Sequence, residues 1–485
     1  MYNANLNGLC MKDDLESLRQ LINELARVDE VDRVNDLLAH YLSLEMDIAA
    51  VKQVARGYVQ KLHAARNHST GVNQLMQEYS LSTPEGVALM CLAESLLRIP
   101  DSHTRNELIR DKLGQADWAA HLGNSTSMFV NAGAWGLFIA GRWVQMPNDN
   151  TLYSILQRLL ARGSEGLIRR SVELAVKLMG QQFVVAETIE EALVNCQEKT
   201  SQGYTYSFDM LGEAAVCDAD AQAYFDSYAH AIQIIGAANP RGVQAGHGIS
   251  VKLSALHPRY TLWQEQRVHE ELYPRLYKLA LSARQMNMAF NIDAEESERL
   301  DLSLDLFTRL AFEPGLSNWN GLGLAVQAYQ TRATAVINYI ALLARSSARI
   351  IQVRLVKGAY WDSEIKRCQV QGLAHFPVFT RKVHTDLSYL CCAEILLRNV
   401  DCIYPQFATH NAHTYAAVQH MAARLQIKNF EMQCLYGMGE GLYSSCRIYA
   451  PVGSHHTLLP YLVRRLLENG SNTSFVNQIT NPRVN

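Results

Sequence analysis

Apolar residues in the first 180 positions follow the spacing of amphipathic helices. Over 13–27 they recur at three- and four-residue intervals, which places them on one face of a helix. The same spacing continues through 34–63, and the STPE sequence at 82–85 combines a cap, a proline and an acid as helix starts do. The most apolar stretch, 129–141, is too short to cross a bilayer and predicts a buried helix. We therefore predict an all-helical arm or cap domain over residues 1–181.

The pattern changes after about residue 182, where short apolar segments alternate with longer amphipathic ones. Helical spacing recurs over 269–285, 300–311 and 333–345. Eight short segments between such stretches predict strands: 206–211, 248–253, 289–293, 323–327, 350–355, 403–408, 430–435 and 447–451. Repeated βα units imply a parallel sheet, and eight of them imply closure into a barrel. We predict an α/β fold, with a (βα)8 TIM-type barrel over residues 182–485.

Composition narrows the class of protein without changing this picture. Hydrophobic residues make up 48% of the chain and charged residues 19%, as in ordinary globular proteins. The net charge of −3 gives no electrostatic footprint for nucleic acid. No basic segment followed by an apolar run suggests secretion, and the ten cysteines include no CxxC pair. Both features favour a reducing, cytoplasmic setting.

Candidate chemistry gathers where the predicted strands end, which is where barrel enzymes place their reactive groups. Each of these residues also has a plainer interpretation as a solvated, ion-paired or capping group. The polar and aromatic positions at these ends are Lys252, Ser254, Asp293, Glu295, Glu296, Gln327, Tyr329, Arg354, Lys357, Tyr360, Trp361, Thr409, His410, Asn411 and Tyr449. So many polar groups at one end of core strands indicate a site rather than stability alone.

The adjacent pair Arg464–Arg465 lies in a predicted final helix that also carries Tyr461 and Glu468. Neighbours on a helix point about 100° apart, yet two guanidinium groups can converge on one ligand carboxylate. Glu468 lies three or four residues beyond them and could hold either fork. Spacing alone slightly favours the alternative, a solvated Arg–Glu face.

Other kinds of site find less support. His410 and His413 are three residues apart but lie in a turn, where hydrogen bonding is commoner than metal binding. The carboxylates of Asp293, Glu295 and Glu296 could hold a divalent cation, which we regard as the minority interpretation. No GxGxxG follows a strand and no GxxxxGK[ST] occurs, so a Rossmann or P-loop nucleotide site is disfavoured. We predict no metal.

Six ordered motifs resemble the proline dehydrogenase domain of the bifunctional proline utilization A (PutA) flavoproteins. They are 206–213 (YSFDMLGE), 252–260 (KLSALHPRY), 291–296 (NIDAEE), 354–362 (RLVKGAYWD), 404–411 (YPQFATHN) and 461–470 (YLVRRLLENG). The resemblance covers about Tyr204 to Val476, and the preceding helices resemble the arm and α-domain of that family. It implies a distorted (βα)8 barrel with non-covalent FAD. It also implies oxidation of L-proline to Δ1-pyrroline-5-carboxylate, with the electrons passed to a membrane quinone.

The resemblance also implies residue roles. Lys252, Asp293, Arg354, Tyr360 and Tyr449 would form the catalytic shell, with Arg354 near the flavin N5 atom. The proline carboxylate would meet Arg464, Arg465 and Lys252. The substrate ring would lie among Leu435, Tyr360, Tyr449 and Tyr461. FAD would be lined by Gln327, Arg354, Val356, Gly358, Ala359, Trp361, Thr380, Lys382, His410, Asn411, Glu468 and Phe475.

The chain departs from the family pattern in two places. Only two serines separate Tyr443 from Cys446, where the family usually has a longer connection. The chain stops at Asn485 with neither the family's aldehyde dehydrogenase domain nor an N-terminal ribbon–helix–helix segment. We therefore expect a fragment of a bifunctional enzyme with no nucleic-acid partner. We expect it to be cytoplasmic and to reach the inner membrane face peripherally.

Two different functions compete with proline oxidation. One is a metal-assisted or Schiff-base lyase or aldolase, built on the carboxylates at 293–296 with Lys252 as the reactive amine. The other is a non-catalytic regulatory module that binds through its helical half. Binding of FAD separates the first from a flavoenzyme, and bleaching of the flavin by proline separates the second.

Overall fold

The computed structural model describes residues 11–66, 104, 184–239, 241–438 and 441–453. By internal contacts the chain divides into two units, one of residues 1–59 with 188–452 and one of 60–187 with 453–485. The first unit contains the eight strands. The helices predicted around 82–85 and over 129–141 lie outside the described residues, as does the predicted helix of Arg464 and Arg465.

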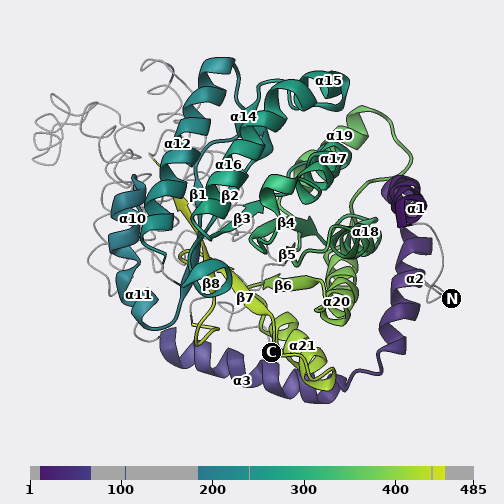
Figure 1. Ribbon diagram of the computed structural model, residues 1–485. Helices are drawn as coiled ribbons and strands as arrows, with labels where there is room; N and C mark the ends of the chain where they lie inside the picture. Colours follow the sequence, from purple (N-terminus) through teal and green to yellow (C-terminus); the bar gives the residue numbers. More distant parts are fainter. Residues whose placement is uncertain (1–10, 67–103, 105–183, 240, 439–440, 454–485) are drawn as a thin grey trace, which may run out of the picture. The chain divides into compact units, whose positions relative to one another are not determined.

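Eight parallel strands close into a barrel in chain order (Figure 1). Each lies within two residues of its predicted bounds, so the predicted barrel is confirmed. The strands are β1 (Thr205–Met210), β2 (Gly248–Val251), β3 (Ala289–Ile292), β4 (Leu322–Gln327), β5 (Ile351–Val356), β6 (Ile403–Ala408), β7 (Glu431–Leu435) and β8 (Arg447–Val452). Closure comes from pairing of β8 with β1 over six residue pairs.

Helices surround the strands, as in other barrels of alternating strands and helices. The predictions for 300–311 and 333–345 are confirmed, and 269–285 forms a helix whose first residues are a π-helical turn, Val268–Leu272. The long barrel helices are α12 (Asp218–Ala237), α16 (Tyr273–Gln285), α17 (Leu300–Ala311), α18 (Ala333–Ser346), α19 (Trp361–Val370), α20 (Lys382–Arg398) and α21 (Ala412–Arg424).

The N-terminal helices are α1 (Met11–Glu24), α2 (Glu30–Ser43) and α3 (Ile48–Arg66). The helical spacing over 34–63 corresponds to two helices rather than one, because the chain breaks between Ser43 and Ile48. Glu45 adopts a positive φ of 47°, which a helix interior does not allow. The Asp47 carboxylate then accepts the backbone N–H of Ala50 at 2.9 Å, as an N-cap does. Apolar periodicity alone did not register this break.

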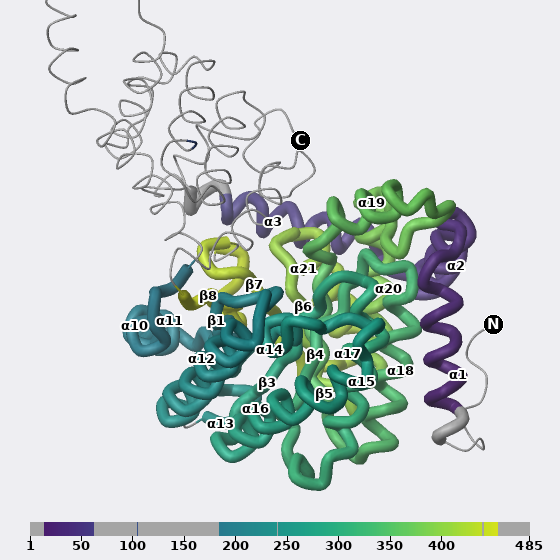
Figure 2. The backbone as a smooth tube through the Cα atoms, turned by 90° about the horizontal axis from the view of Figure 1, so that it is seen from above, coloured from purple at the N-terminus to yellow at the C-terminus, as the bar shows by residue number. Residues whose placement is uncertain are grey.

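Helices α1 and α2 run along the outside of the barrel beside α18 and α20 (Figures 1 and 2). The buried Arg33 of α2 donates from Nε to the carbonyl of Thr331 at 2.7 Å. Leu37 packs with Phe379 and Cys391 in one apolar cluster. The N-terminal segment is therefore attached to the barrel by a buried guanidinium as well as by apolar contacts.

Candidate active site

Three neighbouring strands each carry two polar residues at positions i and i+2 near their carboxyl ends. They are Ser207 and Asp209 of β1, Ser250 and Lys252 at β2, and Asn291 and Asp293 at β3. Alternate residues of a strand point to the same side, so each pair shares one face of the sheet. The register aligns Asp209 with Ser250 and Ser250 with Asn291. Side chains from three strands therefore meet at one end of the barrel.

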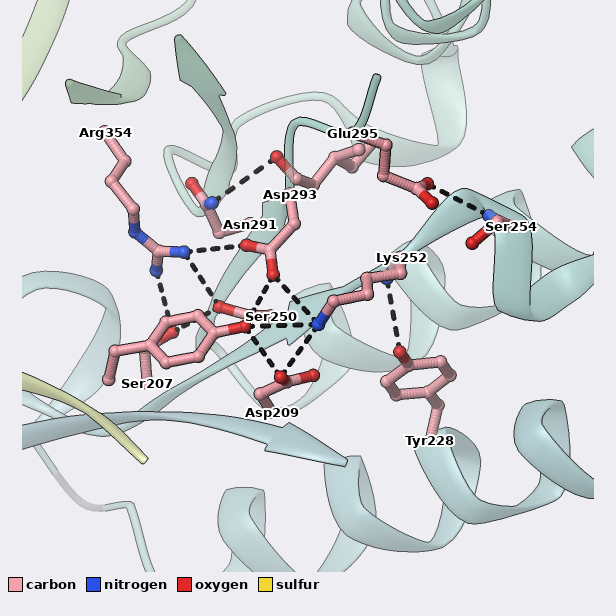
Figure 3. A network of polar contacts seen from close by, with 12 residues as sticks. Ser207, Asp209, Tyr228, Ser250, Lys252, Ser254, Asn291, Asp293, Glu295 and Arg354 are labelled. Carbon is pink, nitrogen blue, oxygen red and sulfur yellow. Dashed lines mark hydrogen bonds and ion pairs between the residues drawn. The ribbon is translucent and has the colours of Figure 1, made fainter. Parts of the chain in front are cut away.

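Lys252 lies among acceptors at this end, as Figure 3 shows for its two carboxylate partners. Its Nζ is 2.8 Å from Oδ2 of Asp209 and 3.3 Å from Oδ2 of Asp293. It also donates to the Tyr449 hydroxyl at 3.2 Å. The ammonium thus has an acceptor within reach for each of its three protons.

The Tyr449 hydroxyl lies between two carboxylates. It is 2.7 Å from Oδ2 of Asp209 and 2.7 Å from Oδ2 of Asp293. Asp209 is completely buried, whereas the Asp293 side chain keeps 11% of its surface exposed. The hydroxyl therefore links an inner carboxylate to an outer one.

Arg354, in the middle of β5, donates to four side chains. Nη1 contacts Asp293 at 2.9 Å and Ser250 at 3.0 Å, and Nη2 contacts Ser207 at 3.0 Å (Figure 3). Nε donates to Gln433 of β7 at 2.8 Å. These contacts use four of the five guanidinium N–H groups, and one on Nη2 has no partner among the described residues. We call Lys252, Asp209, Asp293, Tyr449 and Arg354 the Lys252 network.

Burial and charge set the protonation of this network. Burial disfavours the Lys252 ammonium, but Asp209, Tyr449 and Asp293 outweigh it and raise the pKa of the lysine well above its usual value. Burial, reinforced by the two carboxylates, also raises the pKa of Tyr449, so the phenol stays a hydroxyl. The pKa of Asp209 is raised, mainly by burial, although Lys252 opposes that shift. The lysine is therefore a fixed cation.

The carboxylates at 293–296 do not act together. Glu295 accepts the backbone N–H of Ser254 at 3.1 Å and pairs with Arg299 at 3.0 Å. Glu296 also pairs with Arg299, at 3.3 Å. Only Asp293 belongs to the Lys252 network. In the part of the chain that the structure describes, no group of three or more His, Cys, Asp or Glu residues is arranged to hold a metal ion.

The predicted cofactor residues of β4 and β5 lie together. Gln327, at the end of β4, donates to the carbonyl of Glu295 at 2.8 Å and accepts the N–H of Ala359 at 3.2 Å. Gly358 has a φ of +150°, and a Cβ there would lie 2.4 Å from the ring of Tyr329. Only glycine fits this close approach. The half-buried Val356 and the exposed Gly358–Ala359 backbone thus border the polar end of the barrel.

Three other predicted cofactor residues lie near α19 and α20, each with a protein partner. Trp361 donates from Nε1 to the carbonyl of Phe379 at 2.9 Å. Thr380 donates from its hydroxyl to Glu30 of α2 at 2.6 Å, and Lys382 pairs with Asp386 at 3.1 Å. A ligand at Thr380 would compete with the carboxylate of Glu30.

His410 and Asn411, after β6, hold neighbouring backbone in place. His410 Nε2 accepts the N–H of Leu435 at 3.0 Å, which joins the end of β6 to the end of β7. Asn411 caps α21 by accepting the N–H groups of His413 and Thr414 at 2.9 and 3.1 Å. The interpretation of this turn as hydrogen-bonded is thereby supported.

Six predicted site residues lie at the start of α19 or outside the described residues. Tyr360 is half-buried and is the N-cap residue of α19. The remaining ones lie outside the described residues: Tyr461, Arg464, Arg465, Glu468 and Phe475. The short connection from Tyr443 to Cys446 has buried ends, and the Tyr443 carbonyl accepts the Tyr204 hydroxyl at 2.8 Å.

Sequence reasoning gave no role to four residues that the structure places in contact with the Lys252 network: Asp209, Ser207, Ser250 and Gln433. The signal that could have found three of them is the i, i+2 spacing. Ser207 lies two residues before Asp209, and Ser250 lies two before Lys252. Polar residues at period two inside a predicted buried strand point into the barrel.

Comparison with known proteins identifies the family to which the chain belongs. A family model described as "Proline dehydrogenase" matches residues 192–478. The "Bifunctional protein PutA" of Salmonella typhimurium is 57% identical over 423 residues, which cover 84% of this chain and 32% of that protein. The Escherichia coli protein of the same name is 53% identical and covers 95% of this chain and 36% of its own length. The chain thus spans about a third of these curated relatives.

Structural comparison gives the same result over almost the whole chain. A crystal structure of Bradyrhizobium japonicum proline utilization A (PutA) has a TM-score of 0.71 and 44% sequence identity. The match covers 95% of this chain and 47% of the Bradyrhizobium chain. This likeness agrees with the two predictions made for the fold, a distorted barrel and a helical region that precedes it.

A second family model, described as "DNA-binding domain of Proline dehydrogenase", matches residues 71–183. That description runs against our expectation that the chain has no nucleic-acid partner. The expectation rested on the net charge of the whole chain and on a missing ribbon–helix–helix segment. Neither argument reports on residues 71–183, of which the structure describes Thr104 alone.

Proposed function

The chain belongs to the proline dehydrogenase family, and we propose that its barrel oxidises L-proline to Δ1-pyrroline-5-carboxylate with bound FAD. One observation carries the proposal: the Lys252 network assembles fixed cations, carboxylates and a tyrosine at the carboxyl end of the barrel. Proline is a compact ring with a carboxylate and a secondary amine. It needs cations at one end and apolar or aromatic walls around its methylene groups.

We assign the cationic end of the substrate site to Lys252, Arg464 and Arg465. The raised pKa of Lys252, in which its carboxylate neighbours outweigh burial, keeps the ammonium charged at neutral pH. Such a cation makes short, charge-assisted bonds to a carboxylate. The apolar wall would come from Leu435, Tyr449, Tyr360 and Tyr461.

The residues at this end fit a flavin. One N–H on Nη2 of Arg354 has no partner among the described residues and can donate to a nitrogen of the flavin ring. Gly358 has no side chain, so the flavin can approach its backbone closely. FAD when bound supplies the two-electron chemistry by accepting a hydride at N5. The cation of Arg354 stabilises negative charge that develops near it. We further assign FAD contacts to Gln327, Val356, Ala359, Trp361, Thr380, Lys382, His410, Asn411, Glu468 and Phe475.

The protein residues contribute by binding and positioning the substrate. Lys252 and the arginines hold the substrate carboxylate, which fixes the carbon beside the nitrogen in one place. The amine must lose its proton before its lone pair can assist departure of the hydride. The Lys252 network surrounds that position with groups that accept or hold protons.

The wider reaction is also part of the proposal. Electrons would pass to a membrane quinone, and an aldehyde dehydrogenase domain would oxidise the product further in a longer, bifunctional protein. We propose a cytoplasmic protein that meets the membrane peripherally. Among the described residues, no helix is both long and apolar enough to cross a membrane.

The lyase alternative fits the site less well. A Schiff-base lysine must be neutral to attack a carbonyl, whereas three acceptors hold Lys252 as a cation despite its burial. The carboxylates at 293–296 are divided between Arg354 and Arg299 rather than converging on one point. Both features favour binding of an anionic substrate.

Anaerobic titration with proline tests the proposal directly. Proline should bleach the absorption of the bound flavin, and a colourless protein that takes up no FAD would exclude a flavoenzyme. In Arg465→Met we expect the KM for proline to rise by about 100-fold while FAD stays bound, since a carboxylate partner is lost. Arg309→Met, which changes an exposed cation stacked on Tyr273, is the matched control. Unchanged proline kinetics in Arg465→Met would remove the carboxylate assignment.

A further inference from the structure

The hydroxyl of Tyr449 has one proton and two carboxylate neighbours. Oδ2 of Asp209 and Oδ2 of Asp293 both lie 2.7 Å from it, a distance typical of a hydrogen bond at each contact. A hydroxyl can donate only once. One of the two oxygen–oxygen contacts therefore lacks a proton while both aspartates are charged. We call Asp209, Tyr449 and Asp293 the bridged carboxylate pair, and it has room for one more proton.

The two ends of this pair differ in charge environment. Asp293 contacts two cations, Arg354 at 2.9 Å and Lys252 at 3.3 Å. Asp209 contacts one cation among the described residues, Lys252 at 2.8 Å, and its Oδ1 is buried without a hydrogen-bond partner there. Nearby cations stabilise the charged form of a carboxylate. An added proton is therefore more stable on Asp209 than on Asp293.

The difference in exposure between the two carboxylates determines where a proton enters the pair. The Asp293 side chain keeps 11% of its surface, whereas that of Asp209 keeps none. A proton arriving from a bound ligand meets Asp293 first. Burial, with Asp293 reinforcing it and Lys252 opposing it, raises the pKa of Asp209 and makes the inner site the better acceptor.

We propose that the bridged carboxylate pair accepts the proton that the substrate amine loses, entering at Oδ2 of Asp293 and ending on Oδ2 of Asp209. The proposal rests on the proposed oxidation of proline. The amine N–H bond breaks and its electron pair remains on nitrogen. The new O–H of Asp293 then gives its proton to the oxygen of Tyr449, as the hydroxyl proton of Tyr449 moves to Asp209. No electron leaves the pair, and no further reactant is needed.

The tyrosine passes the proton without becoming an anion. Burial and both aspartates raise the pKa of Tyr449 well above its usual value, so it gives a proton only as it gains one. Among the described residues, the other groups that face the pair are Lys252, Arg354 and the Tyr228 hydroxyl of α12, which accepts the backbone N–H of Lys252 at 3.2 Å. The two cations stay charged at neutral pH, and burial raises the pKa of Tyr228 far beyond it. The carboxylates are therefore the groups in this set that can change charge.

Charge balance links proton uptake to binding of the substrate carboxylate. Two cations, Lys252 and Arg354, balance two anions, Asp209 and Asp293, so an added proton leaves the set with one excess positive charge. A carboxylate bound beside Lys252 compensates that charge. An anion in the site should therefore strengthen proton binding, and protonation should strengthen anion binding by the same factor.

This linkage can be measured without turnover. Cyclopentanecarboxylate has the ring and carboxylate of proline but no amine. Its binding to the oxidised, FAD-loaded protein is followed by calorimetry in buffers that differ in ionisation enthalpy, which counts protons taken up. We expect uptake in the unmodified protein and a Kd that rises by up to about tenfold per pH unit in the window where uptake is complete.

Asp209→Asn should remove proton uptake and flatten the pH dependence of the Kd. Asp305→Asn, a partly buried carboxylate paired with Arg19 outside the site, is the matched control and should leave both unchanged. Infrared difference spectra of the unmodified protein with ¹³C-labelled aspartate need no variant. They should show a protonated aspartate appearing when the analogue binds.

The outcomes separate this inference from the proposed function. Binding of the analogue without proton uptake, or uptake that persists in a folded Asp209→Asn protein, overturns the bridged pair and leaves proline oxidation standing. A failure of the unmodified protein to bind either the analogue or proline overturns both. A binding spectrum without a labelled carboxylic acid overturns the pair alone.

Discussion

The barrel holds two buried ionic networks that satisfy their charges in different ways. In the Lys252 network, side chains contact side chains, and Oδ1 of Asp209 and one N–H on Nη2 of Arg354 have no partner among the described residues. Arg447, two residues before Tyr449, instead donates to Glu431 at 2.7 Å and to the carbonyls of Gly246 and Gln244 at 2.8 and 2.7 Å. We call Arg447 and Glu431 the Arg447 network.

The difference indicates what each network is for. Backbone carbonyls are less free to move than side chains, so Arg447 is held in place and joins β7 and β8 to the short helix α13 (Gly242–Ala245) and its C-cap before β2. Side-chain acceptors can change partners when a ligand arrives, which suits a site. Gln433 connects the networks, because it accepts from Arg354 and donates to Glu431 at 2.7 Å. The Arg447 network therefore holds the Lys252 network in position through Gln433.

The largest expected effect is on stability, from Arg447→Met. The change leaves Glu431 buried without its cation and the two carbonyls without donors, which should lower the free energy of unfolding by about 3–5 kcal/mol. Urea denaturation measures it. Arg345→Met, which breaks the exposed pair with Asp401, should cost less than about 1 kcal/mol. Equal losses in the two variants would show that the Arg447 network is not the structural one.

Acid should weaken the Arg447 network through His247. Burial, followed by Arg447 and Arg241, lowers the pKa of His247 to about 4, and its Nδ1 accepts the N–H of Tyr206 at 3.2 Å. The unfolded chain binds the proton more readily, so stability is complete above about pH 6.5 and falls as pH drops towards 4. The loss should reach about 3 kcal/mol at pH 4. Denaturation of His247→Gln across this range should lack that component, and an identical pH profile would disprove it.

Arg354→Lys, in contrast to Arg447→Met, should lower activity more than it lowers stability. Lysine keeps the positive charge but cannot reproduce four side-chain contacts. We expect the rate of flavin reduction by proline to fall by about 100-fold, as for loss of one oriented stabilising donor. The loss of unfolding free energy should stay below that of Arg447→Met. Stopped-flow absorbance and urea denaturation give the two values, and a reversed order would contradict the division of roles.

One tyrosine hydroxyl in the Lys252 network and one beside the Arg447 network provide the smallest and most closely matched comparison. Tyr449→Phe removes a hydroxyl that bridges two carboxylates, and kcat/KM for proline should fall by about tenfold, or about 1.4 kcal/mol. Tyr404→Phe removes a hydroxyl at 3.4 Å from Glu431 and should leave kcat/KM unchanged. Equal losses of kcat/KM in the two variants would mean that the hydrogen bonds of Tyr449 to the two carboxylates do not account for its effect on the reaction.

Much of the barrel could be predicted because its signals are local. Each strand carries an apolar run, and the intervening helices show the three- and four-residue spacing of a single buried face. The break between Ser43 and Ile48 was not predicted, because apolar spacing continues on both sides of it. Glu45 adopts a positive φ there, but a glutamate, unlike a glycine, does not indicate a positive φ in the sequence. Lys252, Asp293, Arg354 and Tyr449 were predicted as site residues because polar side chains stand out within or directly after apolar strands.

Asp209 was missed because its importance depends on partners from other strands. A lone aspartate inside β1 is as compatible with a cap or a surface pair as with a site. Only closure of β8 onto β1 brings Tyr449 within 2.7 Å of it, across 240 residues of chain. The same holds for Gln433, whose contact with Arg354 spans 79 residues.

The sequence alone determined the class of fold, the order of its strands and the end of the barrel at which polar residues gather, because periodicity and strand ends are properties of short segments. Tertiary structure alone decided which charges meet. It assigned Asp293 to Lys252 and Arg354 but Glu295 to Arg299, although the two acids lie two residues apart. The physical reason is that barrel closure fixes distances between side chains that are remote in the chain, and hydrogen bonds and ion pairs are decided at that range.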